Sequence, residues 1–256
     1  MEKPFFSENS EESWRAKETQ ADIYLEGEME TDSEIWKQLR ETVADCYKEH
    51  GVDQKLIEQF VRHNAQVEGF VNEFADAEHF TKKEKEIAIL AAIMHDITKG
   101  YGDFLKHGEE GGIMAEQILL DLGKSPELAR SVRLVIERHM GTAGFPTEEA
   151  RKVYGEDFQY PMYDTKVEQL VYECDILTQL TREGFDKLLA IRESSDEYTA
   201  EDNITAQASG KTLGQVRYLS VLKSARESLG LIKTKTVREK AEEYWLKIED
   251  EYKDYV

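Results

Sequence analysis

Cysteine is scarce in this chain, and long apolar runs are missing from it. The 256 residues include two cysteines, Cys46 and Cys174, which lack Cys-x-x-Cys spacing and cannot form a disulfide framework. No apolar run approaches the roughly 18–20 residues that span a bilayer. The first residues, MEKPFFSENSEESW, have no basic segment followed by an apolar core, so no signal peptide is expected. We therefore expect a reducing, cytoplasmic location without membrane contact.

Positive charge is also in short supply. Lysine and arginine number 33 against 53 aspartates and glutamates, which gives a formal net charge of −20. Broad binding to nucleic acid or to an anionic membrane requires a basic face, so neither partner is expected. The deficit does not exclude a small phosphorylated substrate, because divalent metal ions can reverse the sign of the local field.

Strand-like alternation and internal repeats are absent as well, and helical periodicity fills most of the chain. Apolar residues recur three and four positions apart from Ile35 onward. Capping boxes are expected at Thr31, Thr81, Thr212 and Thr236, and a strong helix start at 125–127 (Ser-Pro-Glu). This pattern predicts an all-α fold.

Three segments lack the helical pattern. Residues 1 to about 30 are polar and acidic, and we expect them to be loosely held. Residues 141–146 are predicted to form a loop, followed by a shorter helix after Thr147. Residues 194–211, SSDEYTAEDNITAQASGK, are the most loop-like stretch of the second half.

The stretch 87–100, IAILAAIMHDITKG, ends an apolar helix in the adjacent pair His95–Asp96. A histidine and an aspartate at the end of a buried helix are costly unless something binds them. Neighbours on a helix point about 100° apart, so both side chains can reach one ion at the helix edge. The pair is therefore the expected centre of a metal site.

Four more residues point inward from other predicted helices. His63, His107 and His139 continue apolar stripes, and Asp175 lies at the edge of another. Each one alone is better explained as a core or flanking residue, but the set together favours metal ligands. Imidazole and carboxylate without thiolate suit Fe, Mn, Co, Ni or Zn.

The ordered set resembles the HD-domain superfamily of metal-dependent phosphohydrolases. HDITK resembles the family's HD-x-x-K signature, and HGEEGGIMAEQIL resembles the H-G-x-x-G-A helix of members that bind two metals. VIERHMG and VYECDIL resemble the segments that supply the later ligands. The resemblance covers roughly residues 53–190. It implies an N-terminal extension and first helix (1–52), a single HD-domain helical bundle (53–190), and a C-terminal loop and helices packing on it (191–256).

The resemblance also implies roles for single residues. Two divalent transition metals would share Asp96 as a bridge, and a metal-activated hydroxide would attack phosphorus. The implied ligands are His63, His95, Asp96 and Asp175 for the first metal, and His107, His139 and Asp96 for the second. Lys99 would neutralise a substrate phosphate, with Asp96 the second catalytic residue. Arg138 and Lys106 are weaker candidates for phosphate contacts.

The resemblance leaves three functions open. The first is hydrolysis of a phosphomonoester, phosphodiester or phosphoanhydride of a small substrate, with a nucleotide expected and dinucleoside polyphosphates a sensible first panel. The second is a mixed-valent di-iron oxygenase, because some HD-domain oxygenases have the same four histidines and two aspartates. The third is a non-catalytic module that senses a nucleotide. Specificity is expected from residues 141–163 and 194–211, and the C-terminal helix could serve a homodimer.

Overall fold

The computed structural model describes residues 33–140, 148–194 and 196–252. The chain divides into two compact units, residues 1–38 and 39–256. Three predicted features lie outside the described residues: the loop at 141–146, the capping box at Thr31 and the N-terminal segment up to about residue 30. Of the first unit, the structure describes residues 33–38, which begin helix α2. The helices are α2 (Ser33–Glu49), α3 (Gln54–Ala77), α4 (Lys82–Met94), α5 (His107–Asp121), α6 (Pro126–Arg138), α7 (Glu148–Tyr154), α8 (Lys166–Gln179), α9 (Arg182–Ser194), α10 (Asp196–Ser209), α11 (Leu213–Leu231) and α12 (Lys235–Tyr252).

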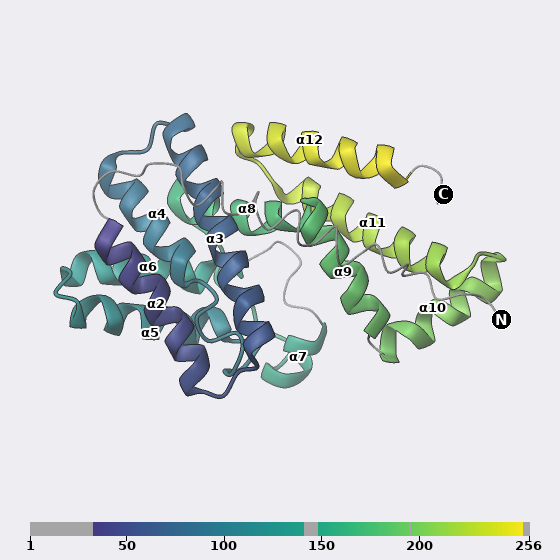
Figure 1. The fold of residues 1–256 in the computed structure, drawn as a ribbon, viewed down its shortest axis with the longest axis horizontal. Coiled ribbons are helices and arrows are strands. Elements are labelled where there is room, and N and C mark those ends of the chain that lie inside the picture. Colours follow the sequence, from purple (N-terminus) through teal and green to yellow (C-terminus); the bar gives the residue numbers. More distant parts are fainter. Residues whose placement is uncertain (1–32, 141–147, 195, 253–256) are drawn as a thin grey trace. The chain divides into compact units, whose positions relative to one another are not determined.

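Helices account for all regular structure in these described ranges, which contain no strand, and the predicted all-α fold is confirmed (Figure 1). The helix that was predicted after Thr147 is α7. None of the described helices combines the length and the apolar character that crossing a bilayer requires.

The predicted capping residues explain where several helices begin. Thr81 and Thr212 each form a capping box, in which the side chain accepts a hydrogen bond from a backbone N–H three residues later. Ser125 caps α6 in the same way, with proline at the first helical position. These local signals fix the ends of helices before any tertiary contact is considered.

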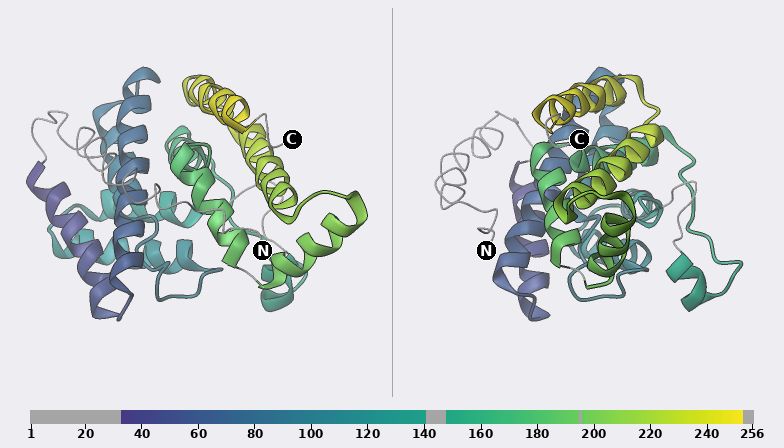
Figure 2. Two further views of the ribbon diagram at one scale, coloured as in Figure 1. Left: turned by 45° about the vertical axis from the view of Figure 1, so that its right-hand side comes forward. Right: turned by 90° about the vertical axis from the view of Figure 1, so that its right-hand side faces the viewer.

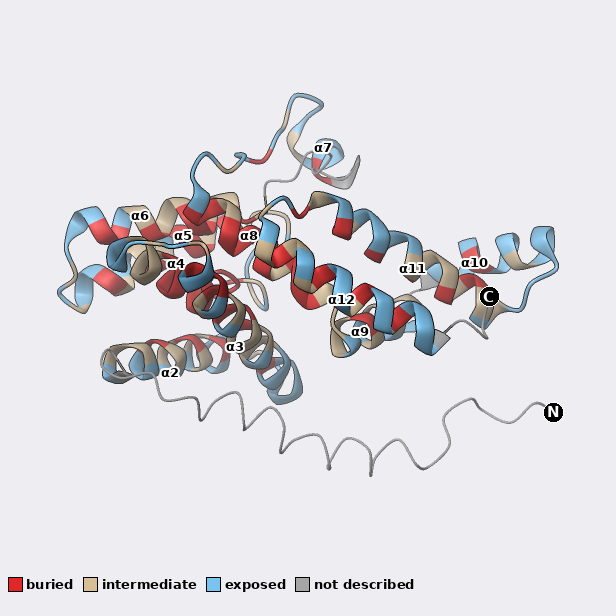
Figure 3. Ribbon diagram, turned by 90° about the horizontal axis from the view of Figure 1, so that it is seen from above, coloured by how far each residue is buried: buried red, intermediate tan, exposed pale blue. Residues whose placement is uncertain are grey.

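Helix α4 forms the middle of the core of the second unit. Every residue from Ala88 to Met94 is buried, because α4 packs against α3, α6 and α8. Figure 3 shows buried residues concentrated on α4, α5 and α8. Helices α5 and α6 lie close together, and a Cβ atom at Gly112 would come within 3.0 Å of the Arg133 backbone oxygen. The buried end of α4 is thus surrounded by other helices.

Helices α9 to α12 adjoin α8 through a chain of neighbouring contacts. Helix α9 packs on α8, α10 on α9 and α11, and α11 on α8 and α9. In Figure 2 the yellow-green α11 and yellow α12 lie beside the green α8 and α9. Buried Glu173 of α8 accepts hydrogen bonds from the backbone N–H groups of Lys233 and Thr234, at 2.7 and 2.9 Å, just before α12.

Two local predictions in this half of the chain are wrong. Residues 196–209 form helix α10, where a loop was expected. Its Asp202 is 1% exposed and pairs with Arg192 of α9 at 2.6 Å, so a tertiary contact overrides weak local propensity. The capping box at Thr236 is not formed as predicted, because α12 already begins at Lys235. The Thr236 hydroxyl donates instead to Glu78, at 2.7 Å.

Candidate metal centre

Six histidine and aspartate side chains from five helices converge on one site in the second unit. They are His63 of α3, His95 and Asp96 at the end of α4, His107 at the start of α5, His139 at the end of α6, and Asp175 of α8. All six residues that the resemblance implied as ligands therefore meet, although 112 positions separate the first from the last. Their convergence follows from the packing of these helices around α4.

The carboxylate of Asp96 lies between two pairs of histidines. Its Oδ2 atom is 3.5 Å from Nε2 of His63 and 3.6 Å from Nε2 of His95. Its Oδ1 atom is 3.2 Å from Nε2 of His107 and 3.6 Å from Nε2 of His139. Each pair forms, with Asp96, a group whose ligand atoms all lie within 4.8 Å of one another and could hold a metal ion.

Asp175 adds a second carboxylate to one side of this arrangement. Its Oδ1 atom is 3.0 Å from Nε2 of His63 and 3.9 Å from Nε2 of His95. The hydroxyl of Thr178, one turn later on α8, donates to the Asp175 carbonyl oxygen at 2.7 Å. The same hydroxyl oxygen lies 3.5 Å from Nδ1 of His63. The side with His63 and His95 therefore has two carboxylates, and the side with His107 and His139 has one.

The hydrogen bonds of the histidines determine which ring nitrogen is free. In His95, His107 and His139, Nδ1 lies 2.5–2.9 Å from the backbone carbonyl oxygen three residues earlier. A carbonyl oxygen can only accept, so Nδ1 carries the proton and Nε2 of the neutral ring presents a lone pair. Such backbone contacts are typical of the groups that orient metal-binding histidines.

The Nε2 atoms of the histidines face one another in pairs. The Nε2 atoms of His107 and His139 are 3.2 Å apart, as are those of His63 and His95. Between His107 and His139, both neutral rings would direct lone pairs at each other. The Asp96 Oδ1 atom beside them is buried and has no hydrogen-bond partner in the described chain. Unpartnered buried acceptors that face one another fit a bound cation.

Burial and neighbouring charges set the protonation of the centre. Burial disfavours the imidazolium form of His95 and lowers its pKa to about 4, so this ring is neutral at pH 7. Burial alone would raise the pKa of Asp96, but the charge of Lys99 and the neighbouring imidazoles outweigh it and hold that pKa well below its usual range. The same balance, led by His63, lowers the pKa of Asp175. The centre therefore presents a neutral imidazole at His95 and ionised carboxylates at Asp96 and Asp175, the forms that bind metals.

Several residues that hold the site in place gave no signal in the sequence. The hydroxyl of buried Tyr47 donates to the backbone carbonyl of Asp96 at 2.7 Å. The side-chain amide of Asn64, the residue after His63, donates to the Ile93 carbonyl at 3.1 Å. These groups fix the turn that follows α4. Ordinary periodicity places both in the core and reveals nothing about their partners.

The three predicted phosphate-binding residues lie in different surroundings. The Lys99 ammonium is 2.7 Å from Asp96 Oδ2, at the centre itself. Burial alone would lower the pKa of Lys99, but Asp96 and Asp175 outweigh it and raise that pKa, so Lys99 is charged. Arg138 binds the Glu168 carboxylate with contacts of 2.8 and 2.9 Å. Lys106 lies 4.4 Å from the centre of the Tyr154 ring.

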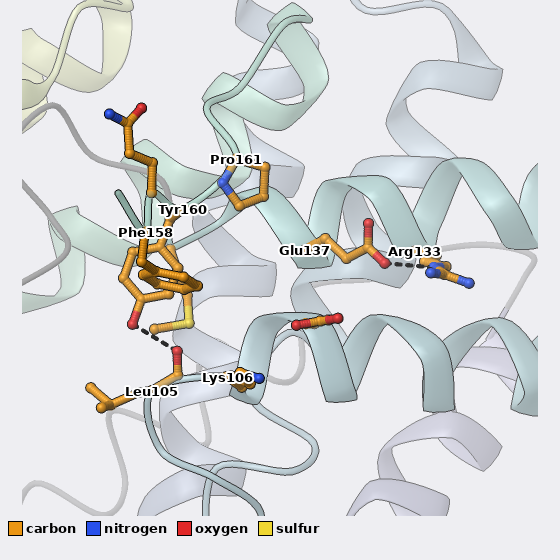
Figure 4. A pocket seen from close by; sticks show the side chains of 10 residues that line it. Leu105, Lys106, Arg133, Glu137, Phe158, Tyr160 and Pro161 are labelled. Atoms are coloured by element: carbon orange, nitrogen blue, oxygen red, sulfur yellow. Dashed lines mark hydrogen bonds and ion pairs between the residues drawn. The ribbon is translucent and has the colours of Figure 1, made fainter. Parts of the chain in front are cut away.

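A cavity of about 340 Å³ borders Lys106 (Figure 4). Arg133 and Glu137 line it from one face of α6, at positions i and i+4, together with Met140 just after that helix. His139 follows Glu137 by two residues, so its side chain points about 200° away round the helix axis. None of the six clustered residues lines this cavity. The cavity and the histidine–aspartate centre are separate features.

Comparison with known families agrees with the geometry. Residues 60–180 match the model of the HD domain family, a span that contains all six clustered residues. Residues 60–180 are therefore similar to the HD domain, which is consistent with the HD-domain superfamily, whose members are in general metal-dependent phosphohydrolases. No significant match was found among curated proteins or among solved structures. The resemblance seen in the sequence is thus confirmed at the level of the family.

Proposed function

We propose that the protein is a metal-dependent hydrolase that cleaves a phosphoric ester or anhydride bond of a small phosphorylated substrate, with nucleotides as the first class to test. The observation that supports this most strongly is the position of Asp96 between two histidine pairs. One carboxylate with each oxygen facing a separate pair of Nε2 atoms suits two ions that share a ligand. Two-metal sites of this kind are typical of phosphoryl hydrolysis.

The residues divide between two proposed ions. His63, His95, Asp96 and Asp175 would hold the first, and His107 and His139 would hold the second together with Asp96. Divalent ions held there would supply Lewis acidity toward phosphoryl oxygens and activate water for hydrolysis. The absence of thiolate among these ligands favours Fe, Mn, Co, Ni or Zn over a soft-metal site.

The protein's own groups contribute orientation and charge. Asp96 is fixed through its backbone by Tyr47 and through its Oδ2 atom by Lys99. Lys99 is charged and half-buried, so it can also contact an anionic phosphoryl oxygen that enters beside Asp96. The Nδ1 hydrogen bonds keep three imidazoles from rotating. These restraints would hold substrate and ligands in one geometry during reaction.

Elemental analysis of untagged protein, combined with activity assays, tests the proposal. We expect at least one transition metal per chain in the wild type and hydrolysis within a panel of phosphomonoesters, phosphodiesters and nucleotides with added Mn²⁺. Asp96→Ala should lose both metal and activity, because it removes the shared ligand. His139→Gln should lose metal from one side only and so retain part of the content.

The exposed His79 supplies a matched control, since His79→Gln removes an imidazole outside the centre. An Asp96→Ala protein with unchanged metal content would contradict the assignment of the centre. Stable mixed-valent iron with oxygen uptake would refute hydrolysis in favour of an oxygenase. Tight binding of one nucleotide without hydrolysis of any panel member would instead indicate a sensing module.

A further inference from the structure

Thr98 joins the turn after α4 to the first residue of α5. Its hydroxyl donates to the backbone carbonyl of His107 at 3.0 Å. Thr98 is 3% exposed and His107 is 4% exposed, so this hydrogen bond is shielded from water. Thr98 lies two residues after Asp96, in one of the two positions that the HD-x-x-K signature leaves unspecified. The signature therefore gives this side chain no role, whereas the structure connects it directly to a clustered histidine.

The loop that follows Thr98 holds this residue in place. The Thr98 carbonyl oxygen accepts hydrogen bonds from the backbone N–H groups of Tyr101 and Gly102, at 3.1 and 2.7 Å. A Cβ atom at Gly102 would lie 3.0 Å from this oxygen and closer still to the Glu110 carboxylate, so the loop folds tightly against the first turn of α5. The Asp103 N–H donates to the same carboxylate at 3.1 Å. The Thr98 hydroxyl is therefore presented from a fixed backbone.

The same loop also orients the imidazole of His107. Nδ1 of His107 lies 2.6 Å from the carbonyl oxygen of Phe104, which sets the orientation of the ring. Thr98 fixes the backbone carbonyl of this histidine. Two contacts from one loop thus place Nε2 of His107, which is 3.2 Å from Oδ1 of Asp96. Because Thr98 and Asp96 belong to one turn, the hydroxyl sets the separation between the shared carboxylate and this histidine.

The histidine pair on the other side of Asp96 is supported by different helices. His63 lies on α3, and the side chain of its neighbour Asn64 donates to the Ile93 carbonyl of α4 at 3.1 Å. Oδ1 of Asp175, on α8, is 3.0 Å from Nε2 of His63. These contacts come from α3, α4 and α8 rather than from the loop between Thr98 and α5. The two sides of the centre therefore have separate supports.

We propose that Thr98 is a positioning residue for the second ion and has no role in holding the first. The inference rests on the proposed function, in which His107, His139 and Asp96 hold the second ion. Loss of a group that orients a metal ligand from outside typically lowers metal affinity tenfold to a hundredfold. Thr98 acts on a backbone carbonyl rather than on the imidazole, so we expect the lower end of this range, roughly tenfold.

Titration of the metal-free protein with Mn²⁺, followed by calorimetry, measures this effect without relying on turnover. The wild type should bind two ions per chain. Thr98→Val replaces the hydroxyl with a methyl group of similar size, so it should bind the second ion roughly tenfold more weakly and the first ion with unchanged affinity. Thr98→Ser keeps the hydroxyl and should bind both ions as the wild type does.

His139→Gln identifies which of the two ions is affected. This variant removes a ligand of the second ion only, so the ion that it retains is the first. Adding Thr98→Val to His139→Gln should leave the affinity for the retained ion unchanged. Weaker binding of that ion in the double variant would refute the assignment, because Thr98 would then act on the whole centre.

Thr236→Val is the matched control for loss of a threonine hydroxyl. The Thr236 hydroxyl donates to the Glu78 carboxylate at 2.7 Å and joins the first turn of α12 to the residue that follows α3. This variant should bind both ions as the wild type does, and urea unfolding of each variant measures stability separately. Thr98→Ala removes the hydroxyl without placing a methyl group against the His107 carbonyl. It should show the same loss of the second ion, including where Thr98→Val does not fold.

The outcomes separate this assignment from the proposed hydrolase. Wild-type affinity for the second ion in Thr98→Ala would refute the role of Thr98, even if the wild type hydrolyses phosphoric esters. A wild type that binds two ions, loses affinity for the second in Thr98→Ala and hydrolyses no member of the panel would refute the hydrolase and retain the role of Thr98. A wild type that binds a single ion would overturn the division between two ions together with this role.

Discussion

Replacing Tyr47 with phenylalanine tests how the fold holds the His95–Asp96 turn. The Tyr47 side chain is fully buried, and its hydroxyl donates to the Asp96 carbonyl at 2.7 Å. Its ring lies 5.2 Å from the ring of Phe60, measured between centroids. Phenylalanine keeps this ring contact and removes the hydroxyl, so the substitution isolates one hydrogen bond.

The structure sets the size of the expected effect. Removing one partner of a buried hydrogen bond costs about 1–3 kcal/mol when the other partner is left unsatisfied. The Asp96 carbonyl also accepts from the Lys99 backbone N–H at 2.8 Å, so it keeps one hydrogen bond. We therefore expect the free energy of unfolding of Tyr47→Phe to fall by about 1 kcal/mol, at the low end of that range. Metal affinity should fall roughly tenfold, because the bond orients a ligand through its backbone.

Urea unfolding of the metal-free protein and a competition assay with a metal chelator measure the two quantities separately. Tyr172→Phe provides the matched control in α8. The Tyr172 hydroxyl is buried and has no hydrogen-bond partner within the described ranges. Removing it should leave stability unchanged or raised, because an unsatisfied polar group disappears. Metal affinity should not change in this variant.

Two results would refute the reasoning about Tyr47. If Tyr47→Phe and Tyr172→Phe had the same stability and metal affinity, the hydroxyl would have no positioning role. If Tyr47→Phe lost more than about 3 kcal/mol, the loss would exceed that of one hydrogen bond and would indicate disrupted core packing.

Two further predictions concern the core around the centre. In metal-free protein, burial lowers the pKa of His95 from 6.5 to about 4, so the neutral buried ring stabilises the fold above pH 6.5 and this stabilisation is lost as the pH falls toward 4. Urea unfolding across this range should show the free energy of unfolding falling by about 3 kcal/mol. A free energy of unfolding that does not change with pH would contradict this prediction. Gly184→Ala should destabilise the protein by about 3 kcal/mol in thermal or urea unfolding, because its methyl group clashes with a carbonyl of α8. Gly69→Ala, in the open middle of α3, should instead gain about 0.5–1 kcal/mol, and equal effects at both glycines would disprove the packing argument.

Local sequence signals predicted most helices because their causes are local. A Thr or Ser side chain that caps the N–H groups of the next turn acts within four residues, as at Thr81, Ser125 and Thr212. Helix α10 was missed because its Asp202 is held by Arg192, ten residues earlier, and lies 3.6 Å from Arg217 of α11. That contact exists only after α9, α10 and α11 have packed together.

The sequence by itself was enough to identify the six clustered residues, because their order along the chain and their positions on predicted apolar helix faces can be read from it. The tertiary structure alone decided how they are arranged, with Asp96 between two histidine pairs. It also placed Arg138 on Glu168. The reason is physical: an arginine at the end of a helix has no pattern that reveals its partner, and only the packing of α6 against α8 brings Arg138 to Glu168.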